Sequence, residues 1–397
     1  MNGPNGVWKG FALKWGKTQF NVDSVLLFAS ASLLIIGYIM VTSASLHLGD
    51  RQEGSSFYYP LRQFVHIAMG FCAAAVAAMT PTAFWEKTGP SLFIAGLGLL
   101  VMVLIPGLGV RVNGAVRWLS LGGVRIQVSE IVKLISVIYM AGYITRHMKT
   151  MRSSALGMLR PLLLLSFACG LLLLEPDYGS AAVIVATALA MMFVGGARFW
   201  QFVVLIAVVA LIGWLLIYFW PYRMARLITF TNPWADPLGN GFQLVQALIA
   251  FGRGEWFGVG LGSSVQKLSY LPEAHTDFLF SVLAEELGLI GVTAVILFFT
   301  AIVWRAFVIG YRAEVAGWTF AAFLAYGLGI WFGLQAFINM GVNMGVLPTK
   351  GLTLPLMSYG GGSMIVMCIS LALLFRVHSE MADVHSTSRG KPGWLGV

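Results

Sequence analysis

The sequence has few charged residues and few cysteines, and both shortages narrow the kinds of protein it can be. Only 10% of its 397 residues are charged, whereas soluble domains carry roughly 25%. Its three cysteines, Cys72, Cys169 and Cys368, all lie inside apolar runs, which excludes a disulfide framework and a CxxC metal site. No Walker A, Rossmann, HExxH or GxSxG motif is present, so a soluble hydrolase or nucleotide-binding enzyme is excluded as well.

Apolar residues dominate the composition instead. The sequence is 58% hydrophobic and its mean hydropathy is +0.82. Its 46 glycines suit closely packed membrane helices, because glycine lets two backbones approach. The net charge is +9, yet no basic run or nucleic-acid-binding motif appears, so we attribute the excess to loops that obey membrane topology.

Long apolar runs predict the fold class directly. A membrane-spanning helix needs about 20 apolar residues, and the sequence holds ten runs of that kind. We therefore predict an all-α integral membrane protein with ten transmembrane helices. The first run begins near Val25 and is long enough to span, so no cleavable signal peptide is expected. The runs are 24–45, 61–79, 90–105, 127–145, 161–175, 179–196, 199–220, 278–303, 318–345 and 357–377.

The distribution of lysine and arginine predicts the orientation of these helices. With the N-terminus inside, the inner segments hold fourteen Lys and Arg residues and the outer segments ten. This bias favours an N-in, C-in arrangement. We expect residues 1–20 and 380–397 to be cytosolic tails, 21–379 to form the ten-helix membrane domain, and 221–277 to be a long extracytoplasmic loop between helices seven and eight.

Two places depart from plain membrane helices. The runs 161–175 and 179–196 are short, since fifteen helical residues reach only about 22 Å against a membrane core of about 30 Å. We expect the turn between them to lie below the outer surface, sheltered by protein. The second place is the long loop 221–277, whose segment 242–250 is amphipathic and is predicted to lie at the membrane interface.

Several arginines lie on the side where the topology rule expects few cations. A local exception of this kind invites a functional explanation, and an anionic substrate on the outside would supply one. The residues are Arg111, Arg117, Arg125, Arg223 and Arg226.

The strongest group of ionisable residues precedes the eighth run. Thr276 can cap a helix that begins at Asp277, and the helix dipole would then keep the Asp277 carboxylate ionised at the mouth of an outward cavity. Glu285 lies two turns further along that helix. A purely structural alternative is that Asp277 is itself a cap and Glu285 the buried partner of a lysine. We weigh the two interpretations equally at this point.

Two further pairs of charged residues lie in or between the runs. Glu130 and Lys133 are spaced i, i+3, so they can form an internal ion pair, and such a pair could also order a substrate phosphate. Glu175 and Asp177 flank a proline in the short turn. They could bind a divalent cation, although capping of the next helix is slightly favoured.

Polar residues also mark the last two runs. Gln335, Asn339 and Asn343 fall at i, i+4 and i+8, a stripe more typical of interhelical hydrogen bonding than of a ligand site. The segment 347–355 places Lys350 in an outer loop between two prolines. The segment 358–363, which begins at Ser358, then opens the last helix, where free amides and hydroxyls could hold an anion.

These motifs together resemble the SEDS family (shape, elongation, division and sporulation) over roughly residues 20 to 380. The most specific segments are 116–119 with 129–133, 175–179, 271–278 and 348–355. Segment 348–355 and Ala274 resemble the division branch of the family rather than its elongation branch. Two positions depart mildly from the family pattern: Val128 stands where a proline is usual, and Gly362 where a serine is frequent.

The resemblance implies a peptidoglycan glycosyltransferase of cell division. Such an enzyme joins lipid-linked disaccharide-pentapeptides (lipid II) into β-1,4 glycan strands with inversion, and it releases undecaprenyl diphosphate. The reaction needs a base for the acceptor hydroxyl, for which we choose Asp277. It also needs cationic groups for the leaving diphosphate, together with Mg²⁺ or Mn²⁺ bound with the substrate, Asp277 being a possible ligand. The candidate cations are Arg117, Lys133, Arg223, Arg226 and Lys350.

The other residues that we expect to contact the substrate come from the same motifs. They are Trp118, Glu130, Glu175, Asp177, Glu273, His275, Glu285 and Ser358. No organic cofactor and no nucleic acid are expected.

The resemblance also implies partners and a location. We expect a class B penicillin-binding protein (the division transpeptidase), other membrane proteins of the divisome, and a site in the bacterial inner membrane at the septum. The alternative function is a lipid II flippase. It would need polar residues from the inner to the outer face, whereas here the inner halves of the spans look apolar and the charges cluster at the outer halves.

Overall fold

The computed structural model describes most of the chain. The described residues are 11–15, 18–112, 115–121, 124–219, 224, 229–239, 241–268, 270–348 and 351–389.

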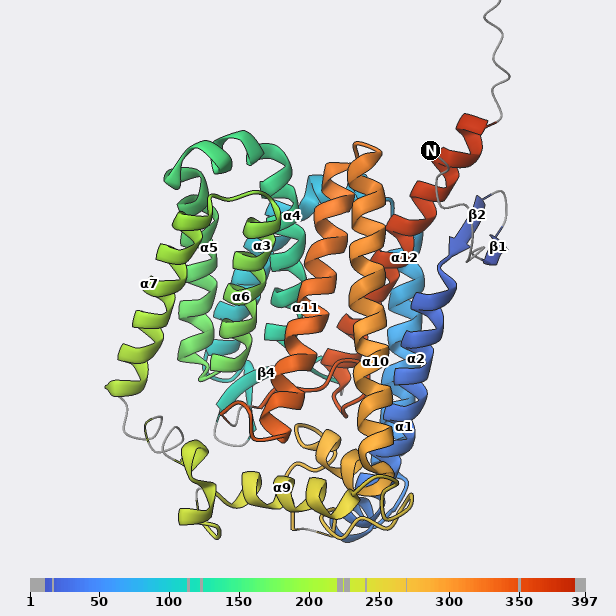
Figure 1. Cartoon of the computed structure of the whole chain (residues 1–397), viewed down its shortest axis with the longest axis vertical. Coiled ribbons are helices and arrows are strands. Elements are labelled where there is room, and N and C mark those ends of the chain that lie inside the picture. The colour runs from blue at the N-terminus through green and yellow to red at the C-terminus, as the bar shows by residue number, and fades with distance from the viewer. Residues whose placement is uncertain are drawn as a thin grey trace, which may run out of the picture.

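Each of the ten apolar runs forms a helix, and most of the helices lie side by side in one bundle (Figure 1). Eight are long and apolar enough to cross a membrane, and α6 and the apolar part of α7 are shorter apolar helices. The chain is therefore an all-α multi-pass membrane protein. The helices are α1 (Ser24–Glu53), α2 (Tyr58–Met79), α3 (Thr82–Leu104), α4 (Val128–Ser153), α5 (Ala155–Leu174), α6 (Tyr178–Val194), α7 (Phe199–Tyr218), α10 (Leu279–Val315), α11 (Thr319–Asn343) and α12 (Gly361–Arg389).

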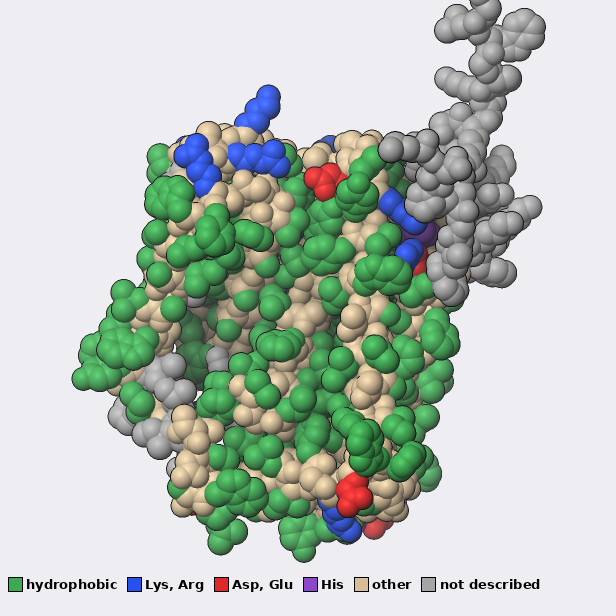
Figure 2. Space-filling model, viewed as in Figure 1, with side chains coloured by type: hydrophobic (Ala, Val, Ile, Leu, Met, Phe, Trp, Pro, Cys, Tyr) green, Lys and Arg blue, Asp and Glu red, His purple; other side chains and the backbone are tan. Residues whose placement is uncertain are grey.

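The helices divide into inner and outer members of the bundle. In α4, 89% of the most apolar stretch is buried, and in α11 and α12 72%, but in α2 only 17%. Figure 2 shows hydrophobic side chains over the middle of one face, with charged side chains near its two ends. A helix that is apolar on all sides suits both positions, because lipid and protein core are equally apolar and the backbone is bonded within the helix.

One end of the bundle carries the helix α9 and a three-stranded sheet, and we call it the α9 end. Helix α9 (Phe242–Gly254) lies across this end, as expected for an amphipathic interfacial segment, and the short helix η1 (Pro233–Ala235) precedes it (Figure 1). An antiparallel sheet of β3 (Gly109–Val112), β4 (Ala115–Leu121) and β5 (Val124–Gln127) connects α3 to α4. The hydropathy pattern did not predict this sheet.

A second sheet lies at the opposite end. It is a hairpin of β1 (Phe11–Trp15) and β2 (Thr18–Val22) and falls mostly within the segment that we expected to be a tail. Helix α12 likewise continues into the expected C-terminal tail.

Helix α5 is longer than the run that predicted it. It begins at Ala155, capped by Ser154, and includes Pro161 as an interior residue. Its 20 residues reach about 30 Å, so the predicted shortness of this run is wrong. The turn that follows is nevertheless buried, with Glu175 1% exposed and Asp177 2% exposed. The expectation that protein shelters this turn is confirmed.

Helix α10 bends where the outer loop joins it. Gly288 has φ 63° and ψ −162°, which interrupts the helical hydrogen bonds. The loop after α9 supplies the missing partners: Val259 N–H donates to the carbonyl of Glu285 at 2.9 Å, and Leu289 N–H donates to the carbonyl of Glu255 at 2.9 Å. A Cβ at position 288 would collide with the backbone of Gly258, so glycine is required there.

A buried ion pair joins three helices at the end opposite to α9. Asp23 caps α1 by accepting from Leu26 N–H at 2.9 Å. Both of its oxygens also accept from Arg305 of α10, with Nε 3.1 Å from each, and Nη2 contacts Oδ2. His378 of α12 lies 3.9 Å away. Asp23 is 3% and Arg305 5% exposed. All three residues lie just outside the predicted runs 24–45, 278–303 and 357–377, so the expectation that the inner halves of the spans are apolar is not contradicted by this pair.

We expect Arg305→Ala to destabilise the fold strongly, because it leaves the Asp23 carboxylate buried without its cation. Removing one member of a buried ion pair costs about 3–5 kcal/mol. Thermal unfolding of the purified protein in detergent measures the loss. Arg312→Ala on the exposed surface of the same helix is the matched control, and equal melting temperatures for the two variants would contradict this account.

Candidate active site

The segment before α10 does not form the helix start that the sequence predicted. Helix α10 begins at Leu279, and Phe278 at its N-cap offers no side-chain acceptor. Thr276 Oγ1 instead donates to Glu273, to the carbonyl at 3.2 Å and to Oε2 at 2.8 Å. The prediction that Thr276 caps a helix beginning at Asp277 is thus wrong, and Asp277 lies in the loop just before α10.

Asp277 is half-buried at the α9 end of the bundle. Its Oδ2 lies so close to Gly351 that a Cβ there would be 2.8 Å away. Burial, followed by the negative charge of Glu273, raises the pKa of Asp277 to about 7, while Arg117 opposes the rise. The expectation of a fully ionised carboxylate is therefore wrong. At neutral pH this group exchanges a proton readily, which suits an acid–base role.

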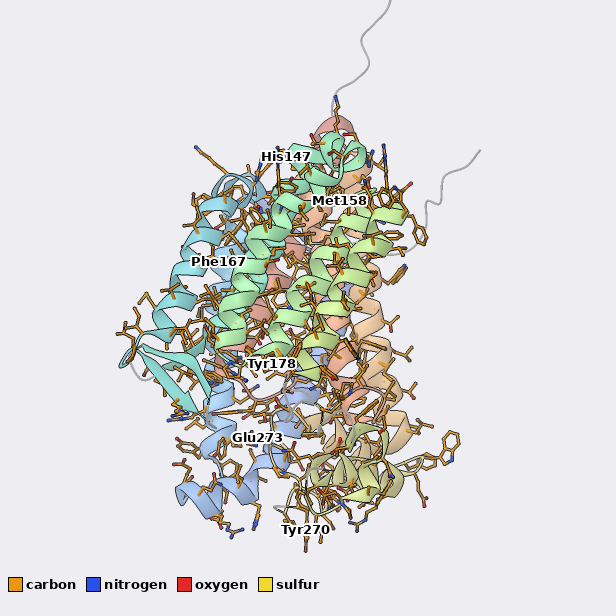
Figure 3. The ribbon with its side chains drawn as sticks, turned by 90° about the vertical axis from the view of Figure 1, so that its left-hand side faces the viewer. His147, Met158, Phe167, Tyr178, Tyr270 and Glu273 are labelled. Carbon is orange, nitrogen blue, oxygen red and sulfur yellow. The ribbon has the colours of Figure 1, made fainter. Side chains whose placement is uncertain are left out.

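Glu273 and His275 line the same loop. Glu273 is exposed, and its backbone has a φ of 56°. In Figure 3 it lies between Tyr178, the first residue of α6, and Tyr270 along the vertical axis of the view. The ring of His275 packs against Tyr359 with 5.4 Å between ring centroids. The Tyr359 N–H donates to the carbonyl of His275 at 3.0 Å, which joins the loop to the segment before α12.

The turn between α5 and α6 is fixed by an arginine of the sheet. Arg117 on β4 donates to the carbonyls of Glu175 at 3.1 Å and Pro176 at 2.5 Å. Asp177 accepts from Ser180 N–H at 3.2 Å and so caps α6, which confirms the capping interpretation. Gln127 also donates to Asp177, at 3.4 Å. The guanidinium of Arg117 is close enough to Asp277 to influence its pKa, so this turn and the Asp277 loop are neighbours.

Glu175 is the unusual member of this turn. It is 1% exposed, and neither carboxylate oxygen has a hydrogen-bond partner within the described part of the chain. Burial, followed by the charge of Asp177, raises the pKa of Glu175 to about 8. The carboxyl is therefore protonated at neutral pH, and it is a poor ligand for a cation in that state.

Glu130 and Lys133 form the internal ion pair that their spacing predicted. The Lys133 Nζ lies 2.8 Å from Glu130 Oε1 and 2.8 Å from Gln335 Oε1, and 5.7 Å from the centre of the Trp331 ring. Lys133 is 2% exposed. Its ammonium is therefore enclosed by protein, and its closest tie to the site runs through Gln335, which donates to the carbonyl of Thr353 at 3.1 Å.

Glu285 anchors the outer loop to α10. It is fully buried and accepts from Arg253 at 3.1 Å, from the Ser264 hydroxyl, and from two backbone N–H groups of the loop. Its cationic partner is thus an arginine, where we had considered a lysine. The next residue, Glu286, pairs with Lys267 at 2.8 Å.

The remaining predicted residues divide into described and undescribed ones. Ser358 is 3% exposed, and its hydroxyl accepts from Leu354 N–H at 2.9 Å, which closes a turn before α12. Trp118 is half-buried in β4, opposite Gln127 of β5. Lys350, Arg223 and Arg226 lie outside the described residues.

The sequence did not single out the aromatic residues of α2 that complete this region. The Tyr59 ring lies 5.0 Å from the His275 ring and 5.4 Å from the Tyr359 ring, and the His66 ring lies 5.9 Å from Tyr359. Arg62 lies over the Tyr58 ring at 4.4 Å. The available signal was the polar start of the run 61–79, where an arginine and a histidine are unusual for a span.

The described residues do not fit a metal site built by protein alone. They contain no group of three or more acidic, histidine or cysteine side chains that could hold an ion. Any divalent cation would have to take most of its ligands from substrate oxygens, and no step is assigned to it below.

The known proteins that are similar to this chain point to a single family. A family model described as "Cell cycle protein" (FtsW, RodA, SpoVE) matches residues 24–383. A relative from Methylococcus capsulatus, named probable peptidoglycan glycosyltransferase FtsW, is 60% identical over 390 residues, which cover 98% of each chain. A relative of the same name from Coxiella burnetii is 48% identical and covers 91% of this chain and 97% of its own.

Solved structures share the fold. One, described as "Structural coordination of polymerization and crosslinking by a peptidoglycan synthase complex", has a TM-score of 0.72 at 28% identity, and the alignment covers 91% of this chain and 98% of the other. The rod shape determining protein RodA of Thermus thermophilus has a TM-score of 0.62 at 26% identity and covers 90% and 96%. The family match and the close relatives show that the chain belongs to the FtsW/RodA/SpoVE family of cell cycle proteins, the SEDS family.

Proposed function

We propose that this chain is a peptidoglycan glycosyltransferase of cell division that polymerises lipid II at the α9 end of its helical bundle. The observation that carries this proposal is Asp277. It is a half-buried carboxyl with a pKa of about 7, in a loop at one end of a membrane bundle, beside an arginine-bearing sheet. At this place a lipid-linked sugar diphosphate would contact both an acid–base group and cationic side chains of the protein.

The chemical step follows from the reaction of a sugar diphosphate with a hydroxyl. The acceptor 4-hydroxyl attacks the anomeric carbon of the donor, and its proton passes to an oxygen of Asp277. The new C–O bond forms as the bond to the diphosphate breaks, and undecaprenyl diphosphate leaves with the electron pair. Attack opposite to the leaving group converts an α-linked donor into a β-1,4-linked product.

The leaving diphosphate needs positive charge close to where its own charge develops. Arg117 is the described cation nearest to this role, although two of its donor groups already hold the α5–α6 turn. We also propose Lys350, which lies outside the described residues, for the diphosphate. Arg223 and Arg226 remain candidates for the same task. Lys133 is enclosed and would act at a distance, by fixing Gln335.

The topology and surroundings form part of the same proposal. We propose ten spans with both termini inside, an arrangement in which the α9 end would face the outside of the inner membrane at the division septum. A single-pass class B penicillin-binding protein would crosslink the new strand. The structural similarity to a chain from a peptidoglycan synthase complex supports this partner.

Asp277→Asn tests the base directly. The amide keeps the size of the side chain but cannot accept the proton, so we expect polymerisation to fall by about 10²–10⁴-fold. Elongation of lipid II by the purified protein with its transpeptidase partner measures the rate. Asp50→Asn, an acid-to-amide exchange at an exposed position of α1, is the matched control. Unaltered polymerisation by Asp277→Asn removes Asp277 from the base role.

The raised pKa of Asp277 predicts a pH dependence. Because burial raises this pKa to about 7, the ionised base is present above that pH and is lost as the pH falls through it. We expect kcat/KM to fall about tenfold per pH unit on the acidic side. Glu273→Gln removes the negative charge that is the second cause of the rise, so its acidic limb should move to lower pH. A profile that stays flat through neutral pH argues against this assignment.

We also propose that Mg²⁺ or Mn²⁺ enters with the diphosphate. The protein alone would then bind the ion poorly, because no described cluster of three ligands exists. We expect a chelator to lower polymerisation, and added Mg²⁺ to leave the melting temperature of the substrate-free protein unchanged. Polymerisation that is indifferent to chelation would eliminate the cation.

A further inference from the structure

The first turn of α10 is capped from another helix. Phe278 at the N-cap supplies no acceptor, yet the first N–H groups of a helix need partners. Asn343 of α11 supplies one: its Oδ1 accepts from Ser281 N–H at 3.1 Å and from the Ser281 hydroxyl at 2.7 Å. Ser281 and Asn343 are both fully buried. The start of α10 is therefore fixed to α11 by a side chain 62 residues further along the chain.

The same asparagine and its neighbour hold the peptide of Asp277. The carbonyl oxygen of Asp277 accepts from Nδ2 of Asn339 at 2.9 Å and from Nδ2 of Asn343 at 3.0 Å. A carbonyl has two lone pairs, and these two amides occupy both. Asn339 is 1% exposed, so water does not compete for these bonds. The backbone that carries the carboxylate is fixed at this point although it belongs to no helix.

The polar stripe of α11 also reaches the loop opposite Asp277. Asn339 Nδ2 donates to the carbonyl of Leu352 at 2.5 Å, and Gln335 donates to that of Thr353. Gly351, the residue before Leu352, lies against the Asp277 carboxylate. One face of one helix therefore sets the distance between the carboxylate and the 351–353 loop.

We propose that Asn339 and Asn343 are positioning residues for the glycosyl transfer. They fix the Asp277 peptide so that its carboxylate meets the acceptor hydroxyl at hydrogen-bond distance. This inference rests on the proposed role of Asp277 as the base. The predicted interhelical hydrogen bonding of the stripe is confirmed by the bonds of Gln335 to Lys133 of α4 and of Asn343 to Ser281 of α10. The bonds of the same stripe to the Asp277 carbonyl are the ones to which we assign a catalytic purpose.

The need for such a clamp follows from where Asp277 lies. Among the described residues, the Thr276 hydroxyl bonds within the loop, to Glu273. The loop is joined to the segment before α12 at His275, and at Asp277 itself the two amides of α11 hold the backbone. Misplacement of a reacting group by about 1 Å can cost about 100-fold in rate. Substrate affinity depends on many other contacts and should be far less sensitive.

Asn339→Ala and Asn343→Ala in the full-length protein with its transpeptidase partner test the inference. Each removes one amide from the Asp277 carbonyl. We expect kcat for lipid II polymerisation to fall by about 10- to 100-fold per folded molecule, with KM unchanged. Ser370→Ala is the matched control. It removes one fully buried side-chain hydrogen bond to a backbone carbonyl, that of Val366 in α12, and its kcat should equal that of the wild type.

The outcomes separate the inference from the function on which it rests. Active Asp277→Asn in the same assay overturns the base role, and the inference with it. Inactive Asp277→Asn together with normal kcat in both asparagine variants overturns the inference alone. An increase in KM without a change in kcat also overturns it, because that pattern indicates a binding contact. Loss of the folded state in both variants, seen as an absent thermal transition, makes the stripe a purely structural element and overturns it as well.

Discussion

Buried polar groups in a membrane bundle must find partners inside the protein, and the site depends on how this chain meets that constraint. Lipid offers neither water nor hydrogen bonds, so a loop that enters the bundle needs side-chain partners for its backbone. Amides on α11 meet this need for the carbonyls of Asp277 and Leu352. Arg117 meets it for the α5–α6 turn. Both devices bring irregular backbone together at the α9 end, and the acidic residues of the site are carried by that backbone.

The sequence predicted the helices well because a membrane span has the strongest signal that a sequence can carry. All ten apolar runs form helices, although the ends of the helices differ from the ends of the runs. Helix α5 starts six residues earlier than its run, since Pro161 and Arg160 interrupt the hydropathy but not the helix. The sheet of β3, β4 and β5 was not predicted, because its strands pair with each other and a hydropathy scan detects only membrane-spanning helices.

The sequence predicted which residues form the site better than it predicted their ionisation and their hydrogen-bond partners. Motif 271–278 identified Asp277, and the short turn identified Asp177 as a cap. The ionisation of Asp277 was misjudged because burial by distant segments does not appear in local sequence. The cap of α10 was misassigned for a similar reason: the acceptor belongs to Asn343, which only the packing of α11 against α10 brings there. The sequence predicted that the polar stripe of α11 forms hydrogen bonds, but nothing in the pattern indicated which groups accept them.

The arrangement of buried charge also bears on whether such a bundle polymerises or transports its substrate. Charges occur at both ends, so their position alone does not decide the matter. The pair Asp23–Arg305 is closed, with both carboxylate oxygens bonded to the guanidinium, and Lys133 is enclosed between Glu130 and Gln335. The saturated pair Asp23–Arg305 has nothing left to offer a passing headgroup, whereas one oxygen of Glu130 has no hydrogen-bond partner among the described residues. Glu175, by contrast, is a buried carboxyl with both oxygens unpaired, and it lies beside the loop of Asp277. A carboxyl of this kind beside the Asp277 loop can offer its oxygens to a sugar at one end of the bundle, which favours chemistry at one face over passage between two.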